Sequence, residues 1–333
     1  MADYIGIKGF TIQSLSSDPP APIEGQVWYN TASNVLKGYK AILGTGAWSS
    51  GGALNTARYG EGGTGTQTAA LCFFGEVPLT TATETYNGTS WTNTTSGNTA
   101  RYVVGSIGQV QTDAGAVGGY GDPTISDKTE IWNGSTWTAS GVLNSGKLGF
   151  VGGAGTTTAG LVTAGGPPPD AGETEIFNGS SWSEEADLNT GRQYGSTCGA
   201  TSTAALCAGG YGATPSAPVR QVVTEIYNGV SWTQTAELNT GRNEAGMFGT
   251  TTSAIFSGGS VPPNTGLTES FDGTSWTEVA DMAGVKGAMG RTASSSTAAA
   301  MFGGHPAPGG QTSITEEWTV PATTFGTRTF TSS

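Results

Sequence analysis

A nine-residue phrase that recurs at a nearly constant interval constrains the fold of this chain more than any other feature. Its first copy, TETYNGTSW, runs from Thr83 to Trp91, and a sixth copy begins at Thr315 but breaks off after its aromatic residue. The other complete copies begin at Thr129, Thr174, Thr224 and Thr268. The glutamates in the phrase are 46, 45, 50, 44 and 47 residues apart. This period is the size of one four-stranded blade of a β-propeller.

Two further features repeat with the phrase. A basic residue stands ten positions after each tryptophan, and a short apolar run that ends in glycine follows it. The six basic residues are Arg58, Arg101, Lys147, Arg192, Arg242 and Lys286. The pattern predicts four short strands in each unit. The first strand follows the basic residue, the second ends at the glycines, the third is Thr-Glu-x-aromatic, and the fourth contains the tryptophan.

The third and fourth strands are separated by Asn-Gly in most copies. This pair is typical of a two-residue hairpin turn, in which both residues have positive φ. Such a turn would pair Tyr86 with Thr89 and Glu84 with Trp91. We expect Glu84, Tyr86 and Trp91 to share one face of the hairpin, where the aromatic rings can pack against the next blade.

The order of basic residue, double glycine, aromatic residue and tryptophan resembles the kelch repeat over roughly residues 41–320. Kelch repeats build β-propellers, so this resemblance implies an all-β, six-bladed kelch-like β-propeller. The sixth unit lacks a fourth strand, whereas the segment Ala47–Ser50 resembles a fourth strand with no unit before it. We therefore expect Ala47–Ser50 to complete the sixth blade and to close the ring.

Residues 1–40 do not match the repeat. We expect them to form an N-terminal docking segment, with a proline-rich connector and a short β-hairpin, ahead of a propeller at 41–322. The tail at 323–333 is expected to add a strand to the same end of the molecule. The stretch DPPAP, followed by GQVWYN and NVLKGY, resembles segments of tailed-bacteriophage virion proteins, particularly tail-fibre-like ones. This resemblance implies attachment to a virus particle, with Val27, Trp28, Tyr29, Leu36 and Tyr39 as the candidate docking residues.

Composition excludes several classes of function. The chain has 13 basic and 25 acidic residues, a net charge of −12 and no basic cluster, which argues against binding to nucleic acid. Its single histidine and three cysteines, with no CxxC motif, argue against a metal centre or a disulfide scaffold. No apolar stretch is long enough to span a membrane, and no secretory signal precedes the repeats. We therefore expect no catalytic residues, cofactor, metal or membrane insertion.

The repeated glutamates and basic residues are expected to form structural ion pairs, because an active site breaks the symmetry of a repeat whereas a scaffold preserves it. The loops between the second and third strands do vary, from six to thirteen residues, and in a propeller they open on one face. Binding sites are usually built on such loops. The candidate ligand-binding residues there are Tyr120, Asp122, Asp170, Tyr211, Arg220 and His305.

These observations predict a non-enzymatic structural protein on the surface of a bacteriophage particle. As a tail-fibre or receptor-binding component, it would contact other virion proteins through its N-terminal segment. It would recognise a host-surface glycan or protein through the loop face. The alternative is a capsid decoration or head-fibre protein with a mainly structural role. A secreted lectin is disfavoured by the missing signal, and a glycan-cleaving enzyme by the lack of a non-repeating pair of carboxylates.

Overall fold

The computed structural model describes residues 12–42, 44–76, 78–121, 123–147, 149, 152–165, 172–212, 219–293, 295–306, 309–322 and 324–330. The chain forms two compact units, which we call the terminal unit (Met1–Thr45 with Val320–Ser333) and the propeller unit (Gly46–Thr319). The regular elements of the described residues are all β-strands. None of the described segments is a helix that could cross a membrane.

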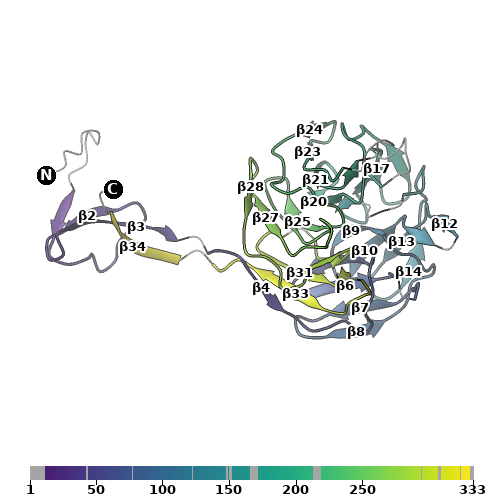
Figure 1. Ribbon diagram of the computed structural model, residues 1–333, viewed down its shortest axis with the longest axis horizontal. Helices are drawn as coiled ribbons and strands as arrows, with labels where there is room; N and C mark the ends of the chain where they lie inside the picture. The colour runs from purple at the N-terminus through teal and green to yellow at the C-terminus, as the bar shows by residue number, and fades with distance from the viewer. Residues whose placement is uncertain are drawn as a thin grey trace. The chain divides into compact units, whose positions relative to one another are not determined.

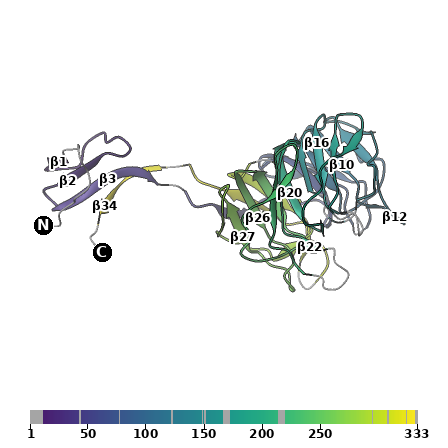
Figure 2. The same ribbon diagram turned by 90° about the horizontal axis from the view of Figure 1, so that it is seen from above.

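The propeller unit consists of six four-stranded antiparallel sheets, or blades, arranged in a ring (Figures 1 and 2). Blade one consists of β5 (Gly62–Thr66), β6 (Ala69–Phe73), β7 (Thr83–Tyr86) and β8 (Trp91–Thr94). Blade two consists of β9 (Gly105–Val110), β10 (Asp113–Val117), β13 (Thr129–Trp132) and β14 (Trp137–Ala139). Blade three consists of β15 (Gly152–Gly155), β16 (Gly160–Thr163), β17 (Thr174–Phe177) and β18 (Trp182–Glu184).

Blade four consists of β20 (Ser196–Thr201), β21 (Ala204–Ala208), β23 (Thr224–Tyr227) and β24 (Trp232–Gln234). Blade five consists of β25 (Gly246–Thr250), β26 (Ser253–Ser257), β27 (Thr268–Phe271) and β28 (Trp276–Glu278). Blade six consists of β30 (Gly290–Arg291), β31 (Ala298–Phe302), β33 (Thr315–Thr319) and β4 (Ala47–Ser50). Short ladders in the loops join β11 (Tyr120–Gly121) to β12 (Thr124–Ile125), β19 (Arg192–Gln193) to β22 (Tyr211–Gly212), and β29 (Lys286–Gly287) to β32 (His305–Pro306).

Ring closure occurs in blade six. Strand β4 comes from the start of the propeller unit and pairs antiparallel with β33 from its end, with Trp48 opposite Trp318. The centroids of these two indole rings are 5.4 Å apart. The innermost strand of blade six, β30, also lies against β5 of blade one. The prediction that Ala47–Ser50 completes the sixth blade is therefore confirmed, and the edge that β33 would otherwise expose is paired.

Glycine in the innermost strands lets the blades approach the axis of the ring. A Cβ atom on Gly153 would lie 1.9 Å from the backbone carbonyl oxygen of Ser106 in the neighbouring blade. A Cβ atom on Gly63 would lie 2.5 Å from the ring of Phe302. Larger residues at these positions would push the innermost strands apart. The second strands are buried apolar segments, whereas the fourth strands expose most of their residues after the tryptophan.

The hairpin between the third and fourth strands corrects one prediction. Tyr86 pairs with Trp91 and Glu84 pairs with Asn93, so the predicted pairing of Tyr86 with Thr89 was wrong. The register differs from the predicted one by two residues, and side chains alternate between faces with a period of two. Glu84, Tyr86 and Trp91 therefore still share one face, and the Tyr86 and Trp91 rings stack with centroids 4.8 Å apart.

The side chain of asparagine explains the longer turn. Asn87 Oδ1 accepts hydrogen bonds from the backbone N–H groups of Thr89 and Ser90, both at 2.9 Å. The turn therefore spans four residues, and only Gly88 has a positive φ, of 88°. In blade five, Asp272 accepts the equivalent bonds, and its hydrogen bonds with Thr274 lower the pKa of its carboxyl group to about 2.

Each blade is joined to the preceding one by a hydrogen bond from its tryptophan. The indole N–H donates to the hydroxyl group of the threonine that begins the third strand of the preceding blade. The pairs, with their N–O distances, are Trp91–Thr315 (2.9 Å), Trp137–Thr83 (3.0 Å), Trp182–Thr129 (2.9 Å), Trp232–Thr174 (2.9 Å), Trp276–Thr224 (3.0 Å) and Trp48–Thr268 (3.2 Å). The six bonds form a complete circle. Tryptophan thus buries a large apolar surface while its one polar group keeps a partner.

The repeated glutamates and basic residues form ion pairs within blades, as predicted. The pairs are Arg58–Glu84, Arg101–Glu130, Lys147–Glu175, Arg192–Glu225, Arg242–Glu269 and Lys286–Glu316. The second oxygen of Glu130 accepts hydrogen bonds from the backbone N–H and side-chain amide of Asn98, at 2.8 and 2.9 Å. An asparagine occupies this position in five of the six units, a repeat that the sequence analysis did not single out. Buried ion pairs need such additional partners to offset the cost of desolvation.

The terminal unit is a four-stranded sheet built from both ends of the described chain. Its order is β1 (Gln13–Leu15), β2 (Val27–Asn30), β3 (Val35–Ile42) and β34 (Thr324–Phe330). Strand β34 pairs with β3 from Leu36–Phe330 to Ile42–Thr324. The expected extra strand is therefore present. The structure divides the units after residues 45 and 319, whereas the predicted boundaries were after residues 40 and 322. The boundaries differ because β3 continues to Ile42 and the tail pairs along it.

Candidate ligand-binding face

The loops between the second and third strands open onto one face of the ring, which we call the variable-loop face. A left-handed backbone residue in each unit shapes this face. The residue two positions after each repeated basic residue has a left-handed backbone. These residues and their φ values are Gly60 (66°), Val103 (48°), Gly149 (85°), Tyr194 (54°), Glu244 (59°) and Ala288 (56°). From Tyr194 round to Val103, neighbouring members are hydrogen bonded from N–H to carbonyl, as from Glu244 to Tyr194 at 3.0 Å and from Ala288 to Glu244 at 2.9 Å. The chain thus turns into the innermost strand in the same way in every unit.

In the five units where the structure describes the residue just after the basic residue, this turn presents that residue to the variable-loop face. There it forms an antiparallel pair with a residue at the start of the loop in the same blade. The pairs are Tyr59–Glu76, Tyr102–Tyr120, Gln193–Tyr211, Asn243–Ser260 and Gly287–His305. In these five units, two sets of side chains therefore lie around the axis, one from the inter-blade connections and one from the loops. The repeat sets their positions, while their chemistry differs from blade to blade.

Four aromatic side chains from these rings form a continuous row across blades six, one and two, which we call the aromatic row. The ring centroids are 5.5 Å apart for His305 and Tyr59, 6.2 Å for Tyr59 and Tyr102, and 5.6 Å for Tyr102 and Tyr120. Each contact is edge-to-face, which is the favourable geometry for such pairs. All four side chains are half-buried, so each retains surface that can contact a ligand.

Two carboxylates flank the aromatic row. Glu76 Oε2 accepts a hydrogen bond of 2.5 Å from the Tyr59 hydroxyl group. Burial and this carboxylate raise the pKa of Tyr59, so the phenol keeps its proton and Glu76 keeps its donor. Glu244 is half-buried, and its desolvation raises the pKa of its carboxyl group against the opposing effects of His305 and Arg220. Glu244 also raises the pKa of Tyr194, whose own burial is the larger cause.

The predicted residues Tyr211 and Arg220 form a second group. Arg220 lies over the Tyr211 ring at 5.7 Å from its centroid, and its Nε donates to the Ser260 carbonyl oxygen at 2.9 Å. Glu244 links this pair electrostatically to His305. The structure thus brings Tyr120, Tyr211, Arg220 and His305 to one face, in two groups. Asp122 and Asp170 lie outside the described residues.

Sequence reasoning missed Tyr59, Tyr102, Glu76 and Glu244. Tyr59 and Tyr102 directly follow the repeated arginines and lie outside the variable loops, where the candidate ligand-binding residues were expected. The available signal was the lack of repetition at the next position, which holds Tyr59, Tyr102, Leu148, Gln193, Asn243 and Gly287 in the six units. A position that is fixed in space but variable in sequence is where a scaffold acquires a site.

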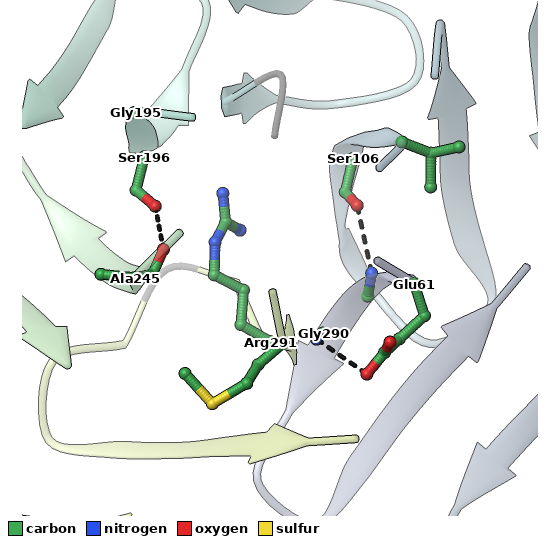
Figure 3. A pocket seen from close by; sticks show the side chains of 10 residues that line it. Glu61, Ser106, Gly195, Ser196, Ala245, Gly290 and Arg291 are labelled. Atoms are coloured by element: carbon green, nitrogen blue, oxygen red, sulfur yellow. Dashed lines mark hydrogen bonds between the residues drawn. The ribbon is translucent and has the colours of Figure 1, made fainter. Parts of the chain in front are cut away.

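A small cavity of about 20 Å³ lies among the innermost strands, with Glu61, Ser106, Ser196 and Arg291 in its wall (Figure 3). Glu61 Oε1 accepts a hydrogen bond of 3.0 Å from Gly290 N–H, whereas its other oxygen is buried without a protein partner. Desolvation raises the pKa of Glu61 to about 8. The Arg291 side chain extends into the cavity in Figure 3 and donates to the Thr197 carbonyl oxygen at 2.6 Å. Such a volume has room for a water molecule.

The described residues contain no group of three His, Cys, Asp or Glu side chains placed to hold a metal ion. The three cysteines are free and buried, and burial raises the pKa of each thiol. Reactive cysteines usually have the opposite properties, namely exposure and a lowered pKa. These thiols therefore pack as small apolar side chains.

The candidate docking residues of the terminal unit lie on both faces of its sheet. Val27 and Tyr29 are 37% and 36% exposed on one face, together with Leu36. Trp28 is on the other face and fully buried, and its indole N–H donates to Asp18 at 3.1 Å. Tyr39 alternates onto the face of Trp28. Trp28 therefore stabilises the unit and is not available to contact a partner.

Exposed Phe330 from the chain end extends the first face. It is 51% exposed and pairs with Leu36, and its ring lies over Gly38. Val27, Tyr29, Leu36 and Phe330 thus form one apolar surface, which we call the terminal apolar face. Phe330 could not be placed on this face from the sequence, because the pairing that puts it there joins residues nearly 300 positions apart.

Comparison with known proteins supports the architecture. No protein-family model and no curated protein sequence matches the chain. Among solved structures, the chain is similar to YjhT, a kelch-like β-propeller, with 13% sequence identity and a TM-score of 0.63. The match covers 82% of this chain and 99% of YjhT. At this level of identity the likeness concerns the fold alone, and the fold of this chain is a kelch-like β-propeller.

Proposed function

We propose that the chain is a non-enzymatic, receptor-binding component of a bacteriophage particle. The propeller unit binds a host-surface glycan or protein through the variable-loop face, and the terminal unit attaches the chain to other virion proteins. The aromatic row carries this proposal. It is a half-exposed cluster of four rings on one side of an otherwise repetitive ring.

The contrast between scaffold and site supports a binding role. The ion pairs and the tryptophan–threonine bonds occur once in every blade, which is expected of elements that hold the ring together. In blades four, five and six, the position directly after the repeated basic residue holds Gln193, Asn243 and Gly287 instead of a tyrosine. Aromatic side chains contribute large contact areas at a small cost in conformational entropy, and they dominate many binding sites.

The terminal apolar face supports attachment through the terminal unit. Its residues are part of, or pair with, the segment that resembles tailed-bacteriophage virion proteins. An apolar surface on a small sheet is typical of a contact with another protein. The same architecture would serve the alternative role, a capsid decoration or head-fibre protein, in which the terminal unit matters more than the variable-loop face.

A double substitution in the aromatic row tests the receptor-binding role. We expect Tyr102→Ala with Tyr120→Ala to weaken binding of the purified protein to host cells by roughly 30-fold, which corresponds to about 2 kcal/mol. The matched control is Val110→Ala with Val230→Ala, which truncates exposed side chains at the opposite ends of the strands. Melting temperatures show whether both variants fold. Unchanged binding by the folded tyrosine variant would contradict the proposal.

Counting copies of the chain in purified particles tests the attachment. Quantitative mass spectrometry against the major capsid protein is expected to give a few copies per particle, as for a tail component. Hundreds of copies would favour the capsid-decoration role instead. Absence from particles would refute a virion location.

The variant Val27→Asp with Phe330→Asp, which places charge on the terminal apolar face, should lose incorporation while keeping a folded propeller.

A further inference from the structure

We infer that the ligand of the variable-loop face is an uncharged glycan, with hydroxyl groups that donate to Glu76 and Glu244. This inference rests on the proposed receptor-binding function and specifies its ligand. Three observations support it: the charge of the propeller unit, the state of its few free basic residues, and the chemistry around the aromatic row.

The propeller unit carries a large excess of negative charge. Of its 22 acidic and 9 basic residues, six of each form the repeated ion pairs, which leaves 16 acidic and 3 basic residues. The terminal unit, in contrast, has 3 acidic and 4 basic residues. A surface of this kind repels an approaching polyanion and slows its association. Polysaccharides rich in carboxylate, phosphate or sulfate groups are therefore disfavoured.

The three remaining basic residues do not form an anion site on the variable-loop face. Arg291 lies in the wall of the small cavity among the innermost strands, where it donates to the Thr197 carbonyl oxygen. Arg220 is held over Tyr211 and donates to the Ser260 carbonyl oxygen, with Glu244 near enough to interact with its charge. Lys128 is a single exposed side chain on a loop. Acidic sugars are usually held by paired or bidentate basic groups, which these residues do not provide.

The aromatic row offers the two kinds of contact that a pyranose ring requires. The C–H faces of a pyranose are apolar and pack on aromatic rings, whereas its edges carry hydroxyl groups that need acceptors. The rings of the row follow one another at 5.5 to 6.2 Å, so the row combines apolar ring surface with the phenol hydroxyl groups of three tyrosines. Glu76 and Glu244 add carboxylate acceptors at its side. Beside an acidic sugar, the same carboxylates would add repulsion.

Selective treatment of host cells separates the ligand classes. Periodate cleaves vicinal diols of sugars, and a protease removes surface proteins. We expect periodate treatment to reduce binding of the full-length protein at least tenfold and protease treatment to leave it unchanged. If protease abolishes binding and periodate leaves it unchanged, the ligand is a protein and the inference is wrong, although receptor binding survives. If untreated cells are not bound at all, the proposed function itself fails.

Competition then tests the charge of the glycan. Polysaccharide extracted from host cells is separated by anion exchange into an unretained, uncharged fraction and a retained, acidic fraction. The uncharged fraction should compete for cell binding, and competition should change little between low and physiological salt because no ion pairs form. Competition by the acidic fraction alone would overturn the inference.

A charge-neutral variant locates the discrimination. Glu76→Gln with Glu244→Gln keeps acceptor oxygens beside the aromatic row and removes two negative charges. We expect this variant to bind the uncharged fraction about tenfold more weakly, because an amide oxygen accepts a weaker hydrogen bond than a carboxylate oxygen. We expect the ratio of its affinities to shift toward the acidic fraction by at least about threefold, because two repelling charges are gone. The control, Glu184→Gln with Glu185→Gln, makes the same change in net charge at exposed residues at the end of an outer strand. An equal effect of both variants would show that the carboxylates beside the row do not select the ligand.

Discussion

At the scale of single residues, Glu61 is the clearest departure from the repeat. The corresponding position holds Val104, Gly195, Ala245 or Met289 in four of the other units. Glu61 is 2% exposed, and one of its oxygens has no protein partner. A buried carboxylate in this state is much less costly when it is protonated. Its raised pKa of about 8 expresses that preference.

The pH dependence of stability tests this account of Glu61. Between the ordinary carboxyl pKa of 4.5 and about 8, the folded state retains a proton that the unfolded state has lost. Stability contributed by this group is therefore complete below about pH 4.5 and decreases as the pH rises to about 8. We expect Glu61→Gln to remove this decrease. The free energy of unfolding, measured with denaturant at pH 5 and pH 9, should fall between the two pH values for the original chain but not for the variant. Between pH 5 and pH 9 the variant should therefore gain a few kcal/mol of stability relative to the original chain. Parallel profiles for the two proteins would contradict the assignment, and Glu184→Gln serves as the exposed control.

At the scale of elements, contacts between blades depend on one bond repeated around the ring. Trp137 and Thr83 are both buried, at 6% and 1% exposure, so either group left alone would lack a partner. The chain uses tryptophan at this position in every complete phrase because the ring needs both its area and its N–H donor. The hydrogen bond also explains why a threonine begins the third strand in each unit.

A double-mutant cycle measures this bond. Trp137→Phe and Thr83→Val should each destabilise the propeller by about 1 to 3 kcal/mol, partly because the remaining partner is buried without a hydrogen bond. The double variant should cost about 1 kcal/mol less than the sum of the single changes. Trp137→Phe with Thr268→Val, which lies in a different blade contact, should be additive to within about 0.5 kcal/mol. Additivity in the first pair would show that the bond contributes nothing to stability.

Elements defined by the repeat could be predicted from the sequence, and features without a repeated signal could not. The closing strand at Ala47–Ser50 was predictable because one unit lacked a strand and another segment had one to spare. The turn at Asn87 was mispredicted because the same Asn-Gly letters fit a two-residue turn, and only the contacts of the asparagine side chain select the longer one. Tyr59 and Tyr102 were missed because their proximity arises from ring geometry, which brings inter-blade connections together around the axis.

At the scale of the whole molecule, the propeller unit is an insertion between two paired strands. In the terminal unit, the ends of β3 and β34 meet where Ile42 pairs with Thr324. In the propeller unit, the chain enters and leaves where Ala47 pairs with Thr319. Each unit thus has its two chain connections side by side, at the ends of two paired strands. Termini that lie close together are what allow one domain to be inserted in another.

Separation of the two units tests this architecture. The segment Gly46–Thr319 expressed alone should form the closed ring and melt within a few degrees of the corresponding transition in the full chain, because ring closure uses only its own residues. It should bind host cells but fail to join particles.

A chain in which a short Asn-Gly-containing loop connects Ile42 to Thr324 should form the terminal sheet, since those residues are already paired. Trp28→Ala in the full chain should lower the stability of the terminal unit and leave the ring transition unchanged. An unfolded Gly46–Thr319 segment, or a ring transition that shifts with Trp28→Ala, would mean that the terminal unit is needed to hold the propeller together.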